Sequence, residues 1–203
     1  MSTSLFPDDV LFFQRLLKAE GLYNKELDGI WGRHTEEAAN KFEELSEQII
    51  EEIGAFDFRT EKNIRTLALT AQKEARKFMN KVRDAGINAK IISGTRTYAE
   101  QNVLYRKGRF GNPGPKITNA KGGQSNHNFG IAWDIGIFTS TGGYITEGDV
   151  YDKAAEAGMT DTLEWGGDWT SFVDKPHYQV KLNLPLKLVR EKFEAGDNYT
   201  MIA

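Results

Sequence analysis

The chain has 203 residues with 39% hydrophobic and 11% aromatic side chains, and its formal net charge is -3. This length and composition indicate a folded protein of one domain, or of one domain with a small appendage, and exclude a disordered chain. The slight negative charge disfavours nucleic acid as a partner, and the absence of cysteine excludes disulfides and thiolate metal ligands.

The N-terminal part of the chain predicts two helices. Pro7 and the acidic residues after it favour a helix start, and Gly21 ends that helix. After a turn, Thr35 is expected to cap a second helix, whose apolar stripe includes Phe42. If this unit has a third helix, it covers 44–53.

A long amphipathic helix is expected over 57–84, because apolar residues from Leu67 to Val82 recur at helical spacing. Gly86 ends this helix. We interpret it as a packing helix without chemistry of its own.

The remainder, 87–193, alternates short strands, helices and polar turns. Thr97 is expected to begin a helix over 97–107, with Glu100 completing a capping box. The other expected elements are strands over 90–93, 131–138 and 177–180, a loop over 110–124, a turn at 142–143 and a short helix over 149–157. This order of helices and short strands indicates an α+β fold.

Two of the three histidines lie in unusual surroundings. His127 ends a polar loop and Asp134 follows in a strand, with Gly130 permitting a sharp bend between them. An unpaired Asp134 carboxylate would cost on the order of several kcal/mol to bury there, and a metal ion would remove that cost. The remaining histidine, His34, is expected at the surface of the N-terminal unit.

A second polar segment contributes His177, with Pro176 fixing the backbone before it and Asp174 a few residues upstream. Two histidines and one carboxylate leave the fourth position of a tetrahedral zinc ion open, which is the pattern of catalytic zinc sites. A carboxylate such as Asp174 near that position could take a proton from activated water. On ligand chemistry alone, a metal site and hydrogen-bonded structural histidines are equally supported.

Longer motifs surround these residues and favour the metal site. They are the blocks 93–97, 119–127, 164–169 and 174–177. In this order they resemble the zinc peptidases that include D-Ala-D-Ala carboxypeptidases and phage L-alanyl-D-glutamate endopeptidases, which share a fold group with lysostaphin and the hedgehog signalling domain. The N-terminal helices, with Trp31-Gly32 after a turn, resemble the helical peptidoglycan-binding domain of many cell-wall hydrolases; a generic two-helix packing unit is the alternative.

The resemblance implies a small antiparallel sheet with flanking helices, of the hedgehog and D-Ala-D-Ala peptidase type, preceded by a small all-helical domain. It divides the chain into a peptidoglycan-binding-like domain over 1–54 and a zinc peptidase domain over 55–203. It also implies a zinc ion held by His127, Asp134 and His177.

Further roles follow from the resemblance for the residues around the zinc. Asp174 matches the general base, and Arg96 matches an arginine that steadies the scissile carbonyl, with a structural salt bridge as the alternative. Ser125 and Trp169 are expected to contact substrate, with roles in the loop or the cleft wall as alternatives. Gln179 departs from the pattern, because some family members have a second histidine there.

The expected substrate and partner is bacterial peptidoglycan. Segments 105–109 and 119–124 resemble the endopeptidase branch, so we expect cleavage of the L-Ala–D-Glu bond in the stem peptides. Removal of terminal D-Ala by a D-Ala-D-Ala carboxypeptidase is the alternative. Two further alternatives are a wall-binding protein with an inactive peptidase domain and a zinc-stabilised signalling or interaction domain.

The start of the sequence bears on where the protein is expected to act. Residues 1–9 lack the basic and apolar runs of a secretory signal peptide, and no stretch is long enough to span a membrane. A wall-binding unit ahead of a catalytic domain, without a signal, resembles a phage lysis enzyme that waits in the host cytoplasm until it is released to the wall. A bacterial wall-remodelling enzyme with another export route is the alternative. We expect a monomer.

Overall fold

The computed structural model describes residues 6–146 and 148–200, which form an α+β fold. The helices are α1 (Pro7–Ala19), α2 (Arg33–Ile53), α3 (Phe58–Ile64), α4 (Leu69–Asp84), α5 (Tyr98–Arg106), α6 (Val150–Gly158) and α7 (Leu186–Ala195), with short 3-10 helices η1 (Asn126–Phe129) and η2 (Gly166–Asp168). The strands are β1 (Ala89–Ser93), β2 (Ala132–Phe138), β3 (Tyr144–Ile145), β4 (Leu163–Trp165) and β5 (His177–Val180). Within these ranges no helix combines the length and apolarity that a membrane crossing requires.

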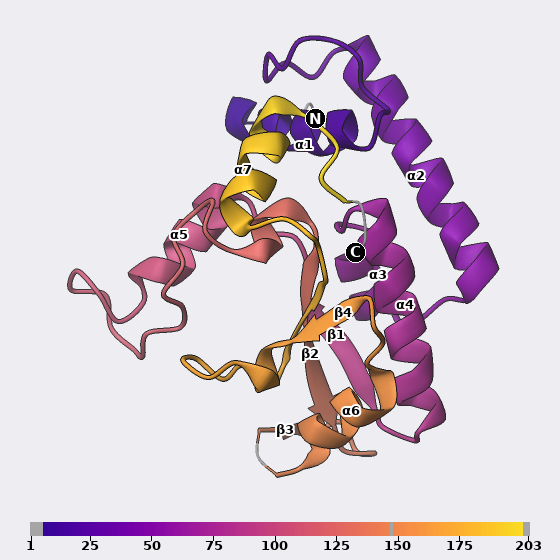
Figure 1. Ribbon diagram of the computed structural model, residues 1–203, viewed down its shortest axis with the longest axis vertical. Coiled ribbons are helices and arrows are strands. Elements are labelled where there is room, and N and C mark those ends of the chain that lie inside the picture. Colours follow the sequence, from indigo (N-terminus) through magenta and orange to yellow (C-terminus); the bar gives the residue numbers. More distant parts are fainter. Residues whose placement is uncertain (1–5, 147, 201–203) are drawn as a thin grey trace.

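The strands form one antiparallel sheet in the order β1-β2-β5-β4, and β3 pairs with the C-terminal end of β2. Figure 1 shows α3 and α4 along one side of this sheet and α5 with the loop that follows it on the other. The expected small antiparallel sheet with flanking helices is therefore confirmed. The capping box at Thr97 is also present, and it begins α5 as expected.

Alternation along β2 and β5 separates a core face of the sheet from a site face. Trp133 and Tyr178 pair across the two strands and are fully buried, and the ring centroid of Tyr178 lies 4.2 Å from that of Phe78 on α4. The next cross-strand pair, Asp134 and His177, points to the opposite face. Packing of the core face onto α4 therefore fixes which side chains reach the other face.

The expected single helix over 57–84 is wrong, because the chain breaks between α3 and α4. The backbone N–H of Ala68 donates to the carbonyl oxygen of Gly130 at 2.9 Å. The N–H of Thr95 donates to Oγ1 of Thr66, also at 2.9 Å. These contacts with distant segments take the place of a continuous helical ladder. The break thereby attaches α4 to the chain segments that lead into β2 and α5.

Gln14 of α1 holds the loop between the first two helices. Its buried Nε2 donates to Oδ1 of Asp28 at 2.8 Å and to Oγ1 of Thr35 at 3.0 Å. Thr35 lies inside α2. Our expectation that Thr35 caps this helix is therefore wrong, because the N-cap position is Gly32. The helix continues without interruption, so the expected separate helix over 44–53 is its last part.

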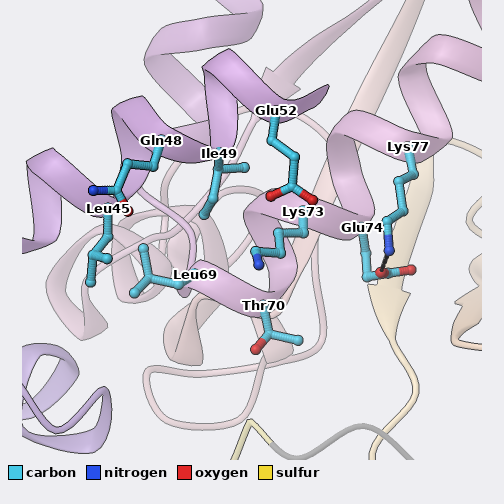
Figure 2. Close-up of a pocket in the computed structure, with 9 residues that line it drawn as sticks. All are labelled: Leu45, Gln48, Ile49, Glu52, Leu69, Thr70, Lys73, Glu74 and Lys77. Atoms are coloured by element: carbon cyan, nitrogen blue, oxygen red, sulfur yellow. Dashed lines mark hydrogen bonds and ion pairs between the residues drawn. The ribbon is translucent and has the colours of Figure 1, made fainter. Parts of the chain in front are cut away.

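The second helix packs along α4 and leaves a groove of about 410 Å³ between them (Figure 2). Leu45 and Ile49 of α2 and Leu69 of α4 contribute apolar surface to this groove. Nearby, Nε2 of Gln72 donates to the buried Oγ of Ser46 at 3.0 Å. The two helices are thus joined by both apolar and polar contacts.

The first helix packs against α7, an element that the sequence did not predict. The ring centroids of Phe12 and Phe193 lie 5.1 Å apart, and the hydroxyl of Tyr199 donates to the carbonyl oxygen of Phe129 at 2.7 Å. Buried side chains of α1, α2, α4 and the sheet belong to one hydrophobic core. The division into domains at residue 54, which falls at the end of α2, stays a prediction.

Candidate metal centre and its cleft

Three side chains from separate elements converge on the site face of the sheet. His127 lies on η1, Asp134 on β2 and His177 on β5, where the register places Asp134 opposite His177. Gly130 makes the expected bend between η1 and β2, with a φ of 66°. A side chain there would bring its Cβ within 2.9 Å of the Ala68 nitrogen, so the position requires glycine.

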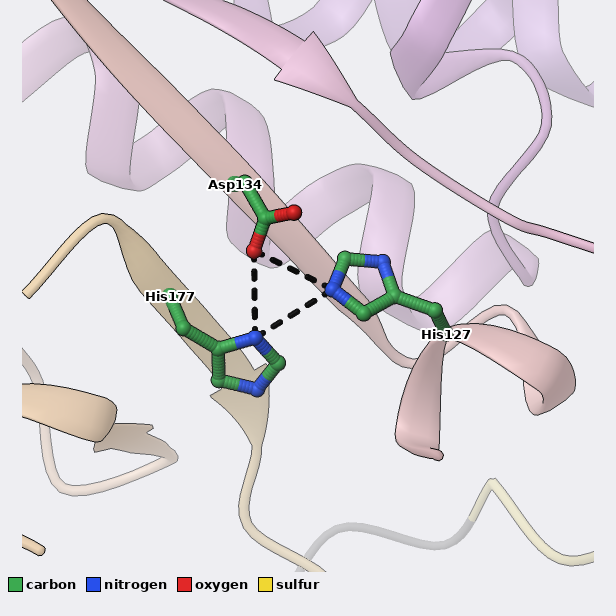
Figure 3. A group of neighbouring side chains, drawn as sticks. All are labelled: His127, Asp134 and His177. Atoms are coloured by element: carbon green, nitrogen blue, oxygen red, sulfur yellow. Dashed lines mark hydrogen bonds and ion pairs between the residues drawn. The ribbon is translucent and has the colours of Figure 1, made fainter. Parts of the chain in front are cut away.

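The donor atoms of this group form a small triangle (Figure 3). Nε2 of His127 and Nδ1 of His177 each lie 3.1 Å from Oδ1 of Asp134, and they lie 3.2 Å from each other. Ligands bound to tetrahedral zinc at about 2.0–2.2 Å are separated by roughly 3.3–3.6 Å. A small outward movement of the side chains would therefore seat the ion, and the donor set suits zinc.

Each donor residue is held from behind by a second hydrogen bond. Nδ1 of His127 donates to the carbonyl oxygen of Gly94 at 2.7 Å. Oδ2 of Asp134 accepts from Nη2 of Arg96 at 2.7 Å. Nε2 of His177 lies 3.0 Å from Oε1 of Gln179. Outer partners of this kind orient metal ligands, and here they leave one donor atom of each residue facing the centre.

Burial and mutual charge set the ionisation of the three residues. Burial lowers the pKa of His127, which favours the neutral imidazole that a metal requires. Burial acts to raise the pKa of Asp134, but the neighbouring His127 and His177 outweigh it and hold that pKa well below its usual range. Burial acts to lower the pKa of His177, but its hydrogen bond with Asp134 outweighs burial and raises that pKa. Asp134 is thus ionised and His127 neutral, and a metal ion would displace a proton from His177 on binding.

All the residues that the sequence assigned to the site line one cleft of about 860 Å³. The lining includes the three donors and also Arg96, Ser125, Trp169 and Asp174. The ring of Trp169 packs on His177, with 4.9 Å between the centroids. Arg96 bonds Asp134, as the salt-bridge alternative proposed, while the role of Arg96 at a scissile carbonyl stays a prediction.

Asp174 is placed in the cleft by backbone contacts with η2. Its N–H donates to the carbonyl oxygen of Gly166 at 2.9 Å, and its own carbonyl accepts from the N–H of His177 at 3.0 Å. A Cβ at Gly166 would lie 2.5 Å from the Asp174 oxygen, so only glycine permits this approach. Burial, followed by the charge of Asp134, raises the pKa of Asp174, which makes its carboxylate a stronger base.

Sequence reasoning missed three polar residues beside the site. Gln101 accepts a hydrogen bond from Arg96 at 3.0 Å, and Asn126 and Glu164 both bond Gln179. Glu164 and Asn126 stand inside the motif blocks, but their partners depend on strand register and could not be read from spacing. Gln179, which we had considered only as a departure near the base, contacts His177.

Comparison with known proteins covers the segment that carries the metal group. Residues 118–180 match the family model described as D-alanyl-D-alanine carboxypeptidase. The matched segment contains the three donors and Asp174, while Arg96 precedes it. The resemblance inferred from the sequence motifs is therefore confirmed over this segment.

A curated relative is named for a different peptide bond. The chain is 36% identical over 105 residues to the peptidoglycan L-alanyl-D-glutamate endopeptidase CwlK of Bacillus subtilis (strain 168). That match covers 47% of this chain and 62% of CwlK, so the chain spans less than two thirds of this relative's length. Among solved structures, the L-Ala D-Glu endopeptidase ChiX of Serratia marcescens is 25% identical with a TM-score of 0.48, over 62% of this chain and 89% of ChiX.

Proposed function

We propose that the protein is a zinc-dependent peptidoglycan hydrolase that cuts the L-Ala–D-Glu bond of cell-wall stem peptides. The observation that carries the proposal is the three-donor group with the carboxylate of Asp174 in the same cleft. Two imidazoles and one carboxylate leave a coordination position open, as in catalytic zinc sites. The similarity to CwlK, which is named for this reaction, supports the choice of bond.

The side chains of the cleft have separate tasks in this proposal. Zinc, when bound, supplies a Lewis acid that lowers the pKa of the attacking water toward neutrality. Asp174, which lines the same cleft, would accept a proton from that water. Arg96 keeps Asp134 oriented and brings positive charge to the cleft wall, where it favours a developing oxyanion. Trp169 covers His177 and limits its contact with solvent.

The charges of the cleft favour internal cleavage over removal of a terminal residue. A carboxypeptidase needs a cation to hold the free C-terminal carboxylate of its substrate. Arg96 is the only lysine or arginine among the cleft-lining residues that the structure describes, and its guanidinium already bonds three side chains. The cleft thus offers a terminal carboxylate no second cation among these residues besides Arg96, which the proposal places near the developing oxyanion, and this supports the endopeptidase.

The D-Ala-D-Ala carboxypeptidase reaction is the second candidate, because the family model matched by residues 118–180 carries that description. Digestion of purified peptidoglycan separates the candidates. The zinc-loaded protein is expected to expose new amino groups on D-Glu, whereas release of D-Ala would favour the carboxypeptidase. Absence of any product in zinc-replete buffer would favour a wall-binding protein without catalysis and would overturn the proposal.

Metal dependence is tested by chelation and by matched histidine variants. A chelator should abolish cleavage, and added zinc should restore it. His177→Ala is expected to lose bound zinc together with cleavage, because it removes one of three donors. His34→Ala removes an exposed histidine of α2 outside the group and should keep its zinc. Equal zinc content in the two variants would show that the group is not the metal site.

We also infer that the unit formed by α1 and α2 binds the wall. A cavity of about 300 Å³ on this unit is lined by Tyr23, Asn24, Lys25 and Glu37, which together offer an aromatic ring and polar groups. Because this unit shares its core with the sheet, a point variant is a cleaner test than truncation. Asn24→Ala should weaken sedimentation with wall sacculi relative to Asn112→Ala, an exposed control; equal sedimentation would contradict the inference.

The cellular setting is proposed on the same resemblance. A wall-binding unit joined to a wall peptidase is typical of phage lysis enzymes, so we propose that the protein acts on the wall after release from a host cytoplasm. Expression in a bacterial cytoplasm should lyse cells only when the membrane is permeabilised. Lysis without permeabilisation would contradict cytoplasmic storage.

A further inference from the structure

A chain of hydrogen bonds runs behind His177, on the side away from the other metal donors. His177 and Gln179 lie on the same face of β5, and Gln179 stands opposite Glu164 of β4. Oε1 of Gln179 lies 3.0 Å from Nε2 of His177, and Nε2 of Gln179 donates to Oε2 of Glu164 at 2.7 Å. Asn126 donates from Nδ2 to the same Oε1 of Gln179 at 2.6 Å.

The carboxylate of Glu164 determines which way the amide of Gln179 points. A carboxylate only accepts hydrogen bonds, so the NH2 end of the Gln179 amide must face Glu164. The oxygen end of the amide then faces Asn126 and His177, and the NH2 group of Asn126 donates to it. A flipped Gln179 amide would set its oxygen against the carboxylate of Glu164. The oxygen of Gln179 is therefore held against the His177 ring.

The fixed amide in turn selects a tautomer of His177. In the neutral imidazole, an oxygen acceptor beside Nε2 places the single proton on Nε2, which leaves the lone pair on Nδ1. Nδ1 is the atom that faces the donors of Asp134 and His127, at 3.1 and 3.2 Å. The tautomer that Gln179 selects is thus the one that can bind a metal through Nδ1.

We propose that Glu164 and Gln179 are positioning residues that hold His177 in its metal-binding tautomer, with Asn126 reinforcing the orientation of the amide. The proposal rests on the zinc site of the proposed function. It differs from a direct catalytic role for Glu164, because the lining of the cleft includes Gln179 but not Glu164. Glu164 instead lines a neighbouring cavity of about 240 Å³ and acts through Gln179, which is only 8% exposed.

Zinc affinity, measured by competition with a chromophoric chelator, tests this arrangement without reference to peptidase activity. Gln179→Leu removes the acceptor and should weaken zinc binding by about 10–100-fold, the usual effect of losing an outer partner of a ligand. Glu164→Gln keeps the acceptor but removes the group that selects its orientation, so a smaller loss is expected. Gln72→Leu changes a buried glutamine of α4 outside the site and should bind zinc like the original chain.

A double exchange separates positioning from general structural support. Glu164→Gln with Gln179→Glu places a carboxylate against Nε2 of His177, and its other oxygen can accept from the new amide at position 164. This variant should recover most of the affinity that Gln179→Leu loses. Undiminished affinity in Gln179→Leu, or no recovery in a folded double variant, would overturn the proposal. If the original chain bound no zinc, the proposed function itself would fail.

Discussion

Arg76 of α4 is an arginine without solvent exposure, and its charge is matched by Glu61 of α3. Nη1 and Nη2 of Arg76 each donate to one carboxylate oxygen of Glu61 at 2.7 Å, and Nη1 also donates to the carbonyl oxygen of Gly54 at 2.9 Å. The side chain of Glu61 is 15% exposed. We predict that Glu61→Gln destabilises the whole fold, because it leaves the guanidinium buried without its counterion.

The expected loss is a large part of the total stability. Removing one partner of a buried ion pair costs about 3–5 kcal/mol, against a free energy of unfolding of roughly 5–15 kcal/mol for a typical domain. For a chain of this size, each kcal/mol corresponds to about 2–4 °C in Tm, so a fall of roughly 6–20 °C is expected. The exposed pair of Arg33 and Glu37 provides a matched control, because water screens this pair and Glu37→Gln should change the stability little.

The loss should also depend on pH. Burial acts to raise the pKa of Glu61, but hydrogen bonds from Arg76 and the Phe56 N–H, with the charge of Arg76, outweigh it and lower that pKa. A carboxyl group with a lowered pKa in the folded state contributes stability that is present above its unfolded pKa of about 4.3. That contribution disappears as pH falls through the folded pKa. The difference between the original chain and Glu61→Gln should therefore shrink in acid.

Urea unfolding followed by tryptophan fluorescence, at neutral pH and at a series of acidic pH values, measures these differences. The midpoint for Glu61→Gln should fall well below that of Glu37→Gln at neutral pH. If the two variants lost the same stability, or if the difference grew in acid, the buried pair would not have the role assigned to it.

Three further predictions concern the site and the packing beneath it. Asp174→Asn should keep its zinc, measured by elemental analysis after dialysis, while kcat falls by about 10²–10⁴-fold through loss of the base; zinc content as low as in His127→Ala would make Asp174 a ligand. Trp169→Ala should raise KM in steady-state kinetics, because it opens the cleft over His177; an unchanged KM would assign Trp169 to the wall alone. Gly158→Ala should lower the unfolding free energy by about 1–3 kcal/mol, since its Cβ would lie 2.3 Å from Phe78; an unchanged urea midpoint would contradict this packing.

Much of the fold and the site could be predicted from local patterns. The strands around Ile135 and His177 and the capped helix at Thr97 were expected from alternation and capping residues, and the structure has them. Their signals lie within a few consecutive residues. The meeting of His127 with His177 was expected from the motif resemblance, since the spacing of the ligands alone left a structural role equally open.

Features fixed by distant contacts could not be predicted. The break before α4 depends on the hydrogen bond from Ala68 to Gly130, which no local pattern contains. The last helix, α7, follows Pro185 at its N-cap position without a side-chain cap, and few of its side chains are buried, so its pattern is weak. The pairing of Glu164 with Gln179 depends on the register of β4 against β5. For the break before α4 and for the Glu164 pairing, the decisive partner lies far away in the sequence.

The pairing register of β2 and β5 has a consequence for the accuracy of folding. A slip of β2 by one residue would turn Asp134 toward α4 and expose Trp133 in its place. A buried carboxylate without its partners and an exposed aromatic ring, with about 150–250 Å² of lost burial, would make the slipped sheet far less stable. The packing of the hydrophobic core therefore favours the one strand register that also places Asp134 and His177 together on the site face.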